Sequence, residues 1–292
     1  MNKLLIISGP TATGKTNLAI KMAKKFNGEL ISADSRQIYR GMNIGTGKDH
    51  SPEVVVHLID IVNPNETFSV AQYRQLALVR MNQIWSENKL PIIVGGTGQY
   101  IDSIINPQPT FSIKPNKILR FFLNKSPVNY LQLIYKCLDK NNFLKLNNSD
   151  VNNPHRLIRK IEIKLSNKKT NRSVKNNYNC LHLSLTASNQ FLYERIDSRI
   201  QSRLDAGLFN EIKNLLKKYS WSSPGLNTLA YKEFSLGFNQ KNIDKWRFDE
   251  HKYARRQKTF FKKLTPIYFL DIANSDFSKK AFNLVKEWYN KA

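Results

Sequence analysis

Eight residues near the start of the chain have the types and spacing of a phosphate-binding loop. They read Gly9-Pro10-Thr11-Ala12-Thr13-Gly14-Lys15-Thr16, after an apolar run that predicts a buried strand and before a segment that predicts a helix. The glycines would let successive backbone N–H groups point at a diphosphate, and the helix N-terminus adds positive charge. Lys15 would reach the outer phosphate, and the Thr16 hydroxyl would bind Mg²⁺. We therefore expect a diphosphate site that uses magnesium.

Two other predicted strands end in side chains that could act on a ligand at this loop. Asp34 follows the apolar run Leu30–Ala33, and Thr97 follows Pro91–Val94 within a Gly-Gly-Thr-Gly sequence. Ligands of open parallel sheets bind beyond the carboxyl ends of the strands, so Asp34 should face the loop, and Thr97 offers a hydroxyl to a ligand. Asp34 suits a general base or an outer-sphere Mg²⁺ ligand, and its position alone does not decide between these roles.

Arginines recur every four residues on one predicted helix, at Arg195, Arg199 and Arg203. Such a row either presents cations to a phosphate or forms a solvated helix face. The whole chain carries a net charge of +24, from 46 Lys and Arg against 22 Asp and Glu. This excess favours a polyanionic partner, of which nucleic acid is the commonest. The alternative is that the Lys, Asn and Ile content reflects an AT-rich coding sequence.

The composition limits the class of protein. The 292 residues are 41% hydrophobic, which is enough for a substantial core, and no run of 18 apolar residues predicts a membrane span. Cys137 and Cys180 are isolated in the sequence, which favours a location in the reducing cytoplasm. We also expect the protein to be a monomer. The five histidines lack the spacing of metal ligands.

Apolar runs that alternate with amphipathic helices predict an α/β fold: a P-loop NTPase-like, largely parallel sheet flanked by helices. Further strands are expected at His57–Ile61, Cys180–Leu185 and Pro266–Leu270, and long helices at Val70–Glu87 and Asn189–Tyr219. Residues 111–179 break the alternation with short helical patterns and a run of Lys, Asn and Arg over 166–179. We expect a core domain of residues 1–110 and 180–292, with 111–179 as a basic helical insertion.

Several motifs occur together in a familiar order. They include GPTATGKT, ISADSRQIYRGMNIGTGK, HLIDIVNP, PIIVGGTGQY, LYERIDSRIQSRLDAGL and YARRQKTFFK. In these motifs nearly the whole chain resembles the tRNA dimethylallyltransferases. The resemblance implies transfer of the dimethylallyl group of dimethylallyl diphosphate to the exocyclic N6 amine of the adenosine just 3′ of the anticodon, with the tRNA anticodon arm as partner.

The resemblance also implies roles for individual residues. Gly9–Thr16, with Lys15, and Arg199 would bind the diphosphate, Asp34 would be the general base, and Thr97 would contact the target nucleotide. The segments that match tRNA-contacting positions comprise Asp34, Ser35, Arg36, Gln37, Thr97, His155, Arg156, Leu157, Ile158, Arg159, Asn227, Thr228, Leu229, Ala230, Tyr231 and Lys232.

The chain departs from the family pattern at a few positions. Ala230 stands where the family usually has Gly, and Asn153 stands where it usually has Asp. Phe260 and Lys262 replace a usual Trp and Arg, and Gly47 replaces a usual Ala. These residues occupy tRNA-contacting or supporting positions, so they bear on efficiency and tRNA range and not on the reaction.

Two other classes of protein share parts of this pattern. A small-molecule or nucleotide kinase would account for the loop, Asp34 and the arginine row, but not for the large positive charge. A nucleic-acid-binding NTPase would need a strand-borne acid beside the loop, and Asp60 is the only candidate.

Overall fold

A computed structural model describes residues 1–48, 53–166 and 177–291. The chain divides into two compact units, which we call the core unit (Met1–Asn106 with Asn176–Ala292) and the insertion unit (Pro107–Lys175). The range expected for the insertion from the sequence was 111–179. Most of the Lys-, Asn- and Arg-rich run expected over 166–179 lies outside the described residues.

The core unit is built on one six-stranded sheet, with the order β3-β2-β4-β1-β5-β6 and every pair parallel. The strands are β1 (Asn2–Ser8), β2 (Gly28–Ser32), β3 (Val56–His57), β4 (Leu90–Gly95), β5 (Tyr178–Thr186) and β6 (Tyr268–Asp271). This confirms the expected α/β class with a parallel sheet. The connection that follows β1 leads towards the β3 edge of the sheet, whereas the connection that follows its neighbour β4 leads to β5 on the other side, so the crevice for a ligand opens at the carboxyl ends of β1 and β4.

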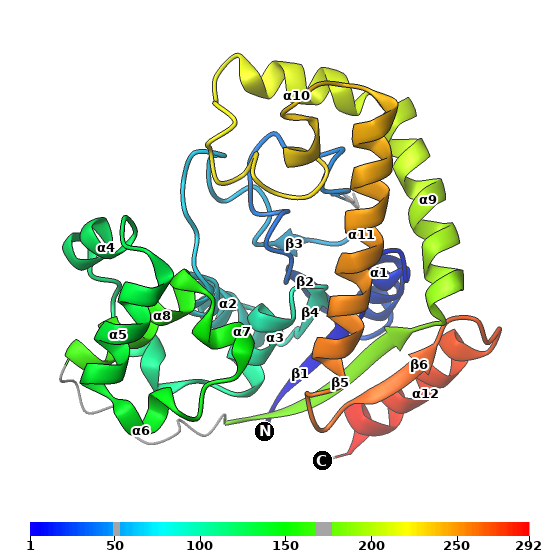
Figure 1. Cartoon of the computed structure of the whole chain (residues 1–292). Coiled ribbons are helices and arrows are strands. Elements are labelled where there is room, and N and C mark those ends of the chain that lie inside the picture. The colour runs from blue at the N-terminus through cyan, green and yellow to red at the C-terminus, as the bar shows by residue number, and fades with distance from the viewer. Residues whose placement is uncertain (49–52, 167–176, 292) are drawn as a thin grey trace. The chain divides into compact units, whose positions relative to one another are not determined.

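Helices cover both faces of this sheet (Figure 1). Those of the core unit are α1 (Lys15–Lys25), α2 (Val70–Ser86), α3 (Gly98–Ile105), α9 (Asn189–Asp205), α10 (Leu208–Leu216), α11 (Gln240–Phe261) and α12 (Phe277–Asn290), with a 3₁₀ turn at Lys232–Phe234. None of the helices in the described ranges is both long and apolar enough to span a membrane.

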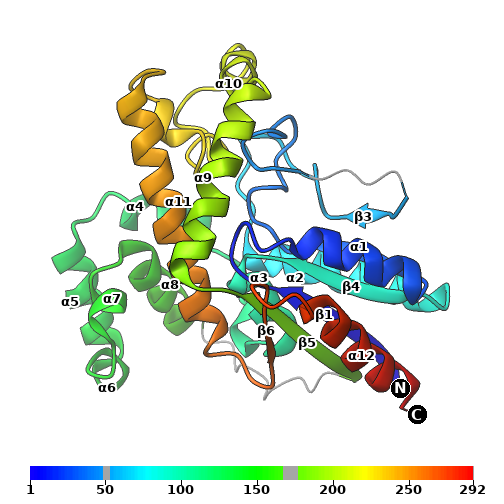
Figure 2. The ribbon, with the colours of Figure 1, turned by 90° about the vertical axis from the view of Figure 1, so that its right-hand side faces the viewer.

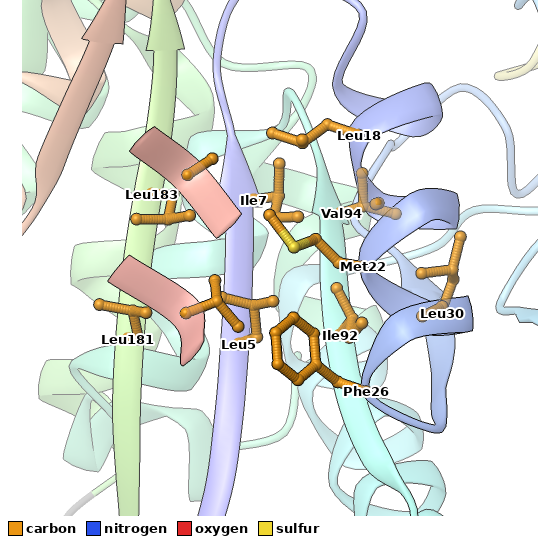
Figure 3. Packing of buried hydrophobic residues seen from close by; sticks show 14 of the residues in the cluster. Leu5, Ile7, Leu18, Met22, Phe26, Leu30, Ile92, Val94, Leu181 and Leu183 are labelled. Atoms are coloured by element: carbon orange, nitrogen blue, oxygen red, sulfur yellow. The ribbon is translucent and has the colours of Figure 1, made fainter. Parts of the chain in front are cut away.

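Alternate residues of the strands belong to two separate hydrophobic clusters, one on each face of the sheet. Leu5 and Ile7 of β1 pack with α1 and α12 on one face (Figure 3; both helices are labelled in Figure 2), whereas Leu4 and Ile6 pack with α2 and α3 on the other. All four β1 side chains are fully buried, which is why this strand is a continuous apolar run in the sequence. A third cluster joins α9, α10 and α11 around the buried Trp246 and Tyr231.

The structure corrects the extent of several predicted elements. The strand expected over His57–Ile61 is only Val56–His57, because Leu58 and Asp60 have positive φ angles of 62° and 54° and leave the extended conformation. The helix expected over Asn189–Tyr219 is two helices, α9 and α10, separated by Gly207 at φ 92°. The last strand begins at Tyr268, not at Pro266.

The insertion unit is a small helical body with its own core. It contains a 3₁₀ turn at Pro109–Ser112 and the helices α4 (Lys117–Leu123), α5 (Val128–Leu138), α6 (Lys140–Phe143), α7 (Asn148–Val151) and α8 (Pro154–Leu165). Leu131, Leu157 and Ile161 are completely buried at its centre. The buried carboxylate of Glu162 accepts two hydrogen bonds from Arg120, at 2.7 and 2.8 Å, and so fastens α4 to α8.

Candidate active site

The phosphate-binding loop connects β1 to α1 and depends on glycine at two positions. Gly9 has φ 144°, and a Cβ there would lie 2.4 Å from the backbone oxygen of Leu185. Gly14 has φ 77° and is the residue that precedes the first turn of α1. Larger residues would be strained at both positions, so the loop geometry follows from its sequence.

Basic side chains converge on this loop. Lys15 folds back on it, and its ammonium donates a hydrogen bond to the Pro10 oxygen at 2.6 Å. Arg195 donates to the Ala12 oxygen at 2.7 Å, and Arg199 donates to the Thr11 hydroxyl at 3.3 Å. The first two arginines of the row on α9 therefore do face the loop.

The third arginine of the row does not join them. Arg203 is 7% exposed and lies 3.8 Å from Glu250, and its Nε and Nη2 atoms have no hydrogen-bond partner in the described structure. Burial and the neighbouring charge of Arg199 lower the pKa of Arg203 to about 9. Arg203 is thus part of a buried charge cluster behind the loop.

One cavity brings together most of the side chains expected to do the chemistry. Lys15, Thr16, Asp34 and Arg199 all line it, together with the backbone of Gly95 and Gly96. The sequence places these residues on three different strand ends and a distant helix, so only the parallel sheet unites them. Thr97 lies next to the cavity, where its hydroxyl accepts a hydrogen bond from the Ser35 N–H at 2.9 Å.

Asp34 is held at the edge of this cavity by its own chain. Its side chain is 17% exposed and accepts a hydrogen bond from the backbone N–H of Arg36 at 2.9 Å. The Arg36 guanidinium, whose Nε lies 3.9 Å from the Asp34 carboxylate, pairs instead with the buried Glu250 at 2.9 Å. Burial alone would lower the pKa of Arg36, but the charges of Glu250 and Asp34 outweigh burial and raise it, so Arg36 keeps its charge.

Several residues of the site come from α11 and were not singled out in the sequence. Gln257 bridges two loops, because its side chain accepts from the Thr11 N–H at 2.9 Å and donates to the Gly96 oxygen at 2.8 Å. Glu250 is the buried partner of Arg36. These residues lie within or near the YARRQKTFFK motif, which was the only signal in the sequence that could have found them.

Asp60, the candidate acid of an NTPase, has a different place. It lies outside any strand, and its carboxylate pairs with Lys48 at 2.6 Å. The Lys48 side chain is completely buried, so this ion pair links two loops structurally. Asp60 is therefore not the strand-borne acid that a nucleic-acid-binding NTPase would need beside the loop.

The expected tRNA-contacting segments are only partly accessible. In the insertion unit, His155 and Arg156 on α8 are exposed, whereas the side chains of Leu157 and Ile158 belong to the core, and Arg159 donates to the oxygens of Thr110 and Ile113. A contact through Leu157 or Ile158 would therefore be indirect.

The same division holds in the segment before α11. Asn227 and Lys232 are exposed and line a shallow hollow with Lys245. Leu229, Ala230 and Tyr231 are buried, and the Tyr231 hydroxyl donates to Glu211 at 2.7 Å. Arg36, assigned to the same set, also has a buried side chain.

The departures from the family pattern have local structural consequences. Ala230 has φ 75°, a left-handed conformation that favours glycine. The ring of Phe260 packs so closely on Gly98 that a Cβ there would be 2.2 Å from it. Asn153 caps α8 by accepting a hydrogen bond from the Arg156 N–H at 3.1 Å, a role that Asp fills equally well.

The sequence profile described as IPP transferase matches residues 37–264. The chain belongs to the IPP transferase family. It is 36% identical to the tRNA dimethylallyltransferase of Roseiflexus sp. (strain RS-1), with 99% of each chain covered, and 35% identical to that of Staphylococcus aureus (strain JH9), with 94% and 95% covered. The loop at 9–16 precedes the profile match, but the alignment with the Roseiflexus protein covers nearly the whole chain.

Solved structures agree with this membership. The tRNA isopentenylpyrophosphate transferase of Bacillus halodurans superposes with a TM-score of 0.74 at 32% identity, over 99% of this chain and 96% of the other. A eukaryotic dimethylallyltransferase, studied crystallographically while acting on tRNA, has the same fold, with a TM-score of 0.84 at 23% identity. The chain is therefore a member of a family of prenyl-transferring enzymes, as the motifs predicted, which argues against the kinase and NTPase readings.

Proposed function

We propose that this IPP transferase family member transfers the dimethylallyl group from dimethylallyl diphosphate to the N6 amine of the adenosine 3′ of the anticodon in tRNA. The observation that carries the proposal is the single cavity lined by Lys15, Thr16, Arg199 and Asp34. It sets cations for a leaving diphosphate beside a carboxylate that can accept a proton. The names of the similar proteins supply the substrate class.

The chemistry of the reaction explains this pairing. An adenine amine is a weak nucleophile because its lone pair is delocalised into the ring. As it forms a bond to the first carbon of the dimethylallyl group, Asp34 would accept its proton. The bond from that carbon to the diphosphate oxygen breaks at the same time, and the electron pair leaves with the diphosphate. Lys15, Arg199 and the loop amides would stabilise the negative charge that develops there.

The residues of the cavity also fit a magnesium ion. No group of three His, Cys, Asp or Glu that could hold a metal is found among the residues the structure describes. Mg²⁺ commonly takes one or two protein oxygens and completes its shell with substrate phosphates and water. Thr16 would bind the ion directly and Asp34 through water, and the bound ion would neutralise charge on the diphosphate.

The tRNA would bind through positive charge on both units. The net charge of +24 supports a polyanionic substrate, and exposed basic side chains occur in the core unit at Lys232 and in the insertion unit at Arg156. An adenine within a folded anticodon loop must leave its stack to reach Asp34.

A two-substrate assay tests the proposal. The protein is incubated with bulk tRNA and with either labelled dimethylallyl diphosphate or labelled ATP. We expect label in tRNA from dimethylallyl diphosphate alone. Label from ATP in tRNA or in a small molecule, without any from dimethylallyl diphosphate, would point to a kinase instead.

A further inference from the structure

The ring of Tyr253 lies beside the side chains assigned to the acceptor nucleotide. Tyr253 is a half-buried residue of α11, and its ring packs against Arg36, whose Nε lies 3.9 Å from the Asp34 carboxylate. The charge of Asp34 is close enough to help raise the pKa of this phenol, although burial is the main cause. The ring therefore borders the place that the adenine amine must reach, and nothing in the reaction chemistry above uses it.

Two arginines, one buried and one exposed, lie over this ring. The guanidinium carbon of Arg36 lies 4.9 Å from the ring centroid, and Arg36 is itself buried and paired with Glu250. Because Arg36 is buried, this contact covers the ring from the interior of the protein. The exposed Arg256, whose guanidinium carbon is 5.9 Å from the same centroid, belongs to the outer surface of α11.

We propose that Tyr253 is the platform on which the extruded adenine stacks, with the Arg256 guanidinium covering the opposite face of the base. This inference rests on the proposed function, since it concerns the base that accepts the prenyl group. Proteins that bind an unstacked base commonly hold it against an aromatic ring and an arginine plane. Stacking would hold the purine in place, while Thr97 and Asp34 contact its polar edge.

The test compares two tRNAs that differ only at the target position, one with adenosine and one with an abasic ribose. Replacing Tyr253 by Leu keeps an apolar side chain of similar bulk but removes the flat ring. We expect Tyr253→Leu to weaken binding of the adenosine tRNA by about 5- to 100-fold, the range for loss of one base–aromatic stack. Binding of the abasic tRNA should stay near the wild-type value. Tyr253→Phe keeps the ring and should bind both tRNAs nearly as wild type does.

Tyr193 provides a matched control. It is also half-buried and close to α11, but its ring is stacked on His251, with centroids 4.0 Å apart and planes 13° from parallel. Tyr193→Leu should therefore change the affinity for the adenosine tRNA and for the abasic tRNA by the same factor. The affinity of each Leu variant for abasic tRNA also reports whether the protein is folded.

A second measurement needs no substitution. Wild-type protein irradiated with tRNA that carries 8-azidoadenosine at the target position should become crosslinked in the peptide containing Tyr253. Crosslinks confined to peptides outside α11 would overturn the proposal. So would an equal loss of affinity for both tRNAs in Tyr253→Leu, or a loss of affinity for dimethylallyl diphosphate alone, which would mean that the ring contacts the prenyl chain. If wild-type protein transferred no dimethylallyl group at all, the proposed function would fail instead, whatever the crosslinks show.

Discussion

At the scale of single residues, backbone conformation and burial explain features that side-chain chemistry alone does not. Ala230 adopts φ 75° in the segment that matches a tRNA-contacting region, and it is completely buried. An L-residue with a side chain is strained in this conformation, whereas glycine is not. The family's usual glycine at this position is therefore the residue that the backbone demands.

Ala230→Gly should raise the free energy of unfolding by about 0.5–1 kcal/mol, because relief of the strain exceeds the extra chain entropy of glycine. Chemical denaturation of the variant and the wild type measures this. The same substitution at Ala77, in the middle of α2, should instead lower the stability by about 1 kcal/mol or more. An Ala230→Gly protein that is less stable than wild type would contradict the assigned backbone conformation.

Glu233 should make stability depend on pH. It is 2% exposed, and burial raises its pKa from 4.5 to about 7. A carboxyl group with a raised folded-state pKa favours folding when protonated, so its contribution is complete below pH 4.5 and is lost as the pH rises towards 7. Over this range we expect a loss of about 2–3 kcal/mol.

Glu233→Gln keeps an oxygen that can accept the 3.0 Å hydrogen bond from the Ala230 N–H but cannot ionise. Denaturation curves between about pH 4 and pH 8 should therefore show a smaller decline for the variant than for wild type. Parallel curves for the two proteins would show that Glu233 titrates normally.

At the scale of elements, α11 links the parts of the site, and a buried charge cluster fastens it. Glu250 of α11 lies between Arg36, which follows β2, and Arg203 of α9. The Arg36–Glu250 contact is a hydrogen bond of 2.9 Å, whereas the Arg203–Glu250 ion pair is longer, at 3.8 Å. Two buried cations thus share one carboxylate, and Arg36 makes the closer contact with it.

Glu250→Gln should lower the free energy of unfolding by about 3–5 kcal/mol, because it leaves Arg203 buried without this counter-charge and leaves Arg36 with only the Asp34 carboxylate, 3.9 Å away. Arg203→Met should change it by less than about 1 kcal/mol or raise it, since the Arg36–Glu250 pair survives and an unsatisfied buried charge disappears. Thermal or chemical unfolding of the two variants tests this order. A larger loss for Arg203→Met than for Glu250→Gln would mean that Arg203 is the true partner.

Features of the fold and the site that have a local pattern in the sequence could be predicted, and those that depend on tertiary packing could not. The strands β1, β4 and β5 were predicted because buried parallel strands are continuous apolar runs. The end of β3 was missed because the positive φ angles of Leu58 and Asp60 leave no mark in an apolar sequence. The phosphate-binding loop is a local motif, whereas Glu250 meets Arg36 from 214 residues along the chain, which only tertiary packing reveals.

At the scale of the whole molecule, the positive charge is the feature that a tRNA substrate would explain. Replacing the insertion unit, Pro107–Lys175, by a short Gly/Ser linker should leave a core unit that still binds dimethylallyl diphosphate, because the loop and the sheet lie outside the deleted range. The affinity for tRNA should fall. Its salt dependence should also become shallower, by about 0.7–0.9 in the log–log slope for each phosphate that the shortened protein no longer neutralises.

Filter binding at several salt concentrations measures this slope for both proteins. Equal slopes would mean that the basic residues of the insertion unit are only solvated surface, as an AT-rich coding sequence would produce, and that the core unit alone binds the tRNA.

The central claim is that the cavity at the phosphate-binding loop, with Asp34 as base, prenylates one adenine of tRNA. Single-turnover transfer from labelled dimethylallyl diphosphate tests it, with two tRNAs that carry adenosine or guanosine 3′ of the anticodon. We expect wild-type protein to label the adenosine tRNA only. Asp34→Asn, which can still accept the Arg36 N–H bond, should bind both substrates but react about 10²–10⁴-fold more slowly. Label on both tRNAs, or a near-wild-type rate for Asp34→Asn, would contradict the account.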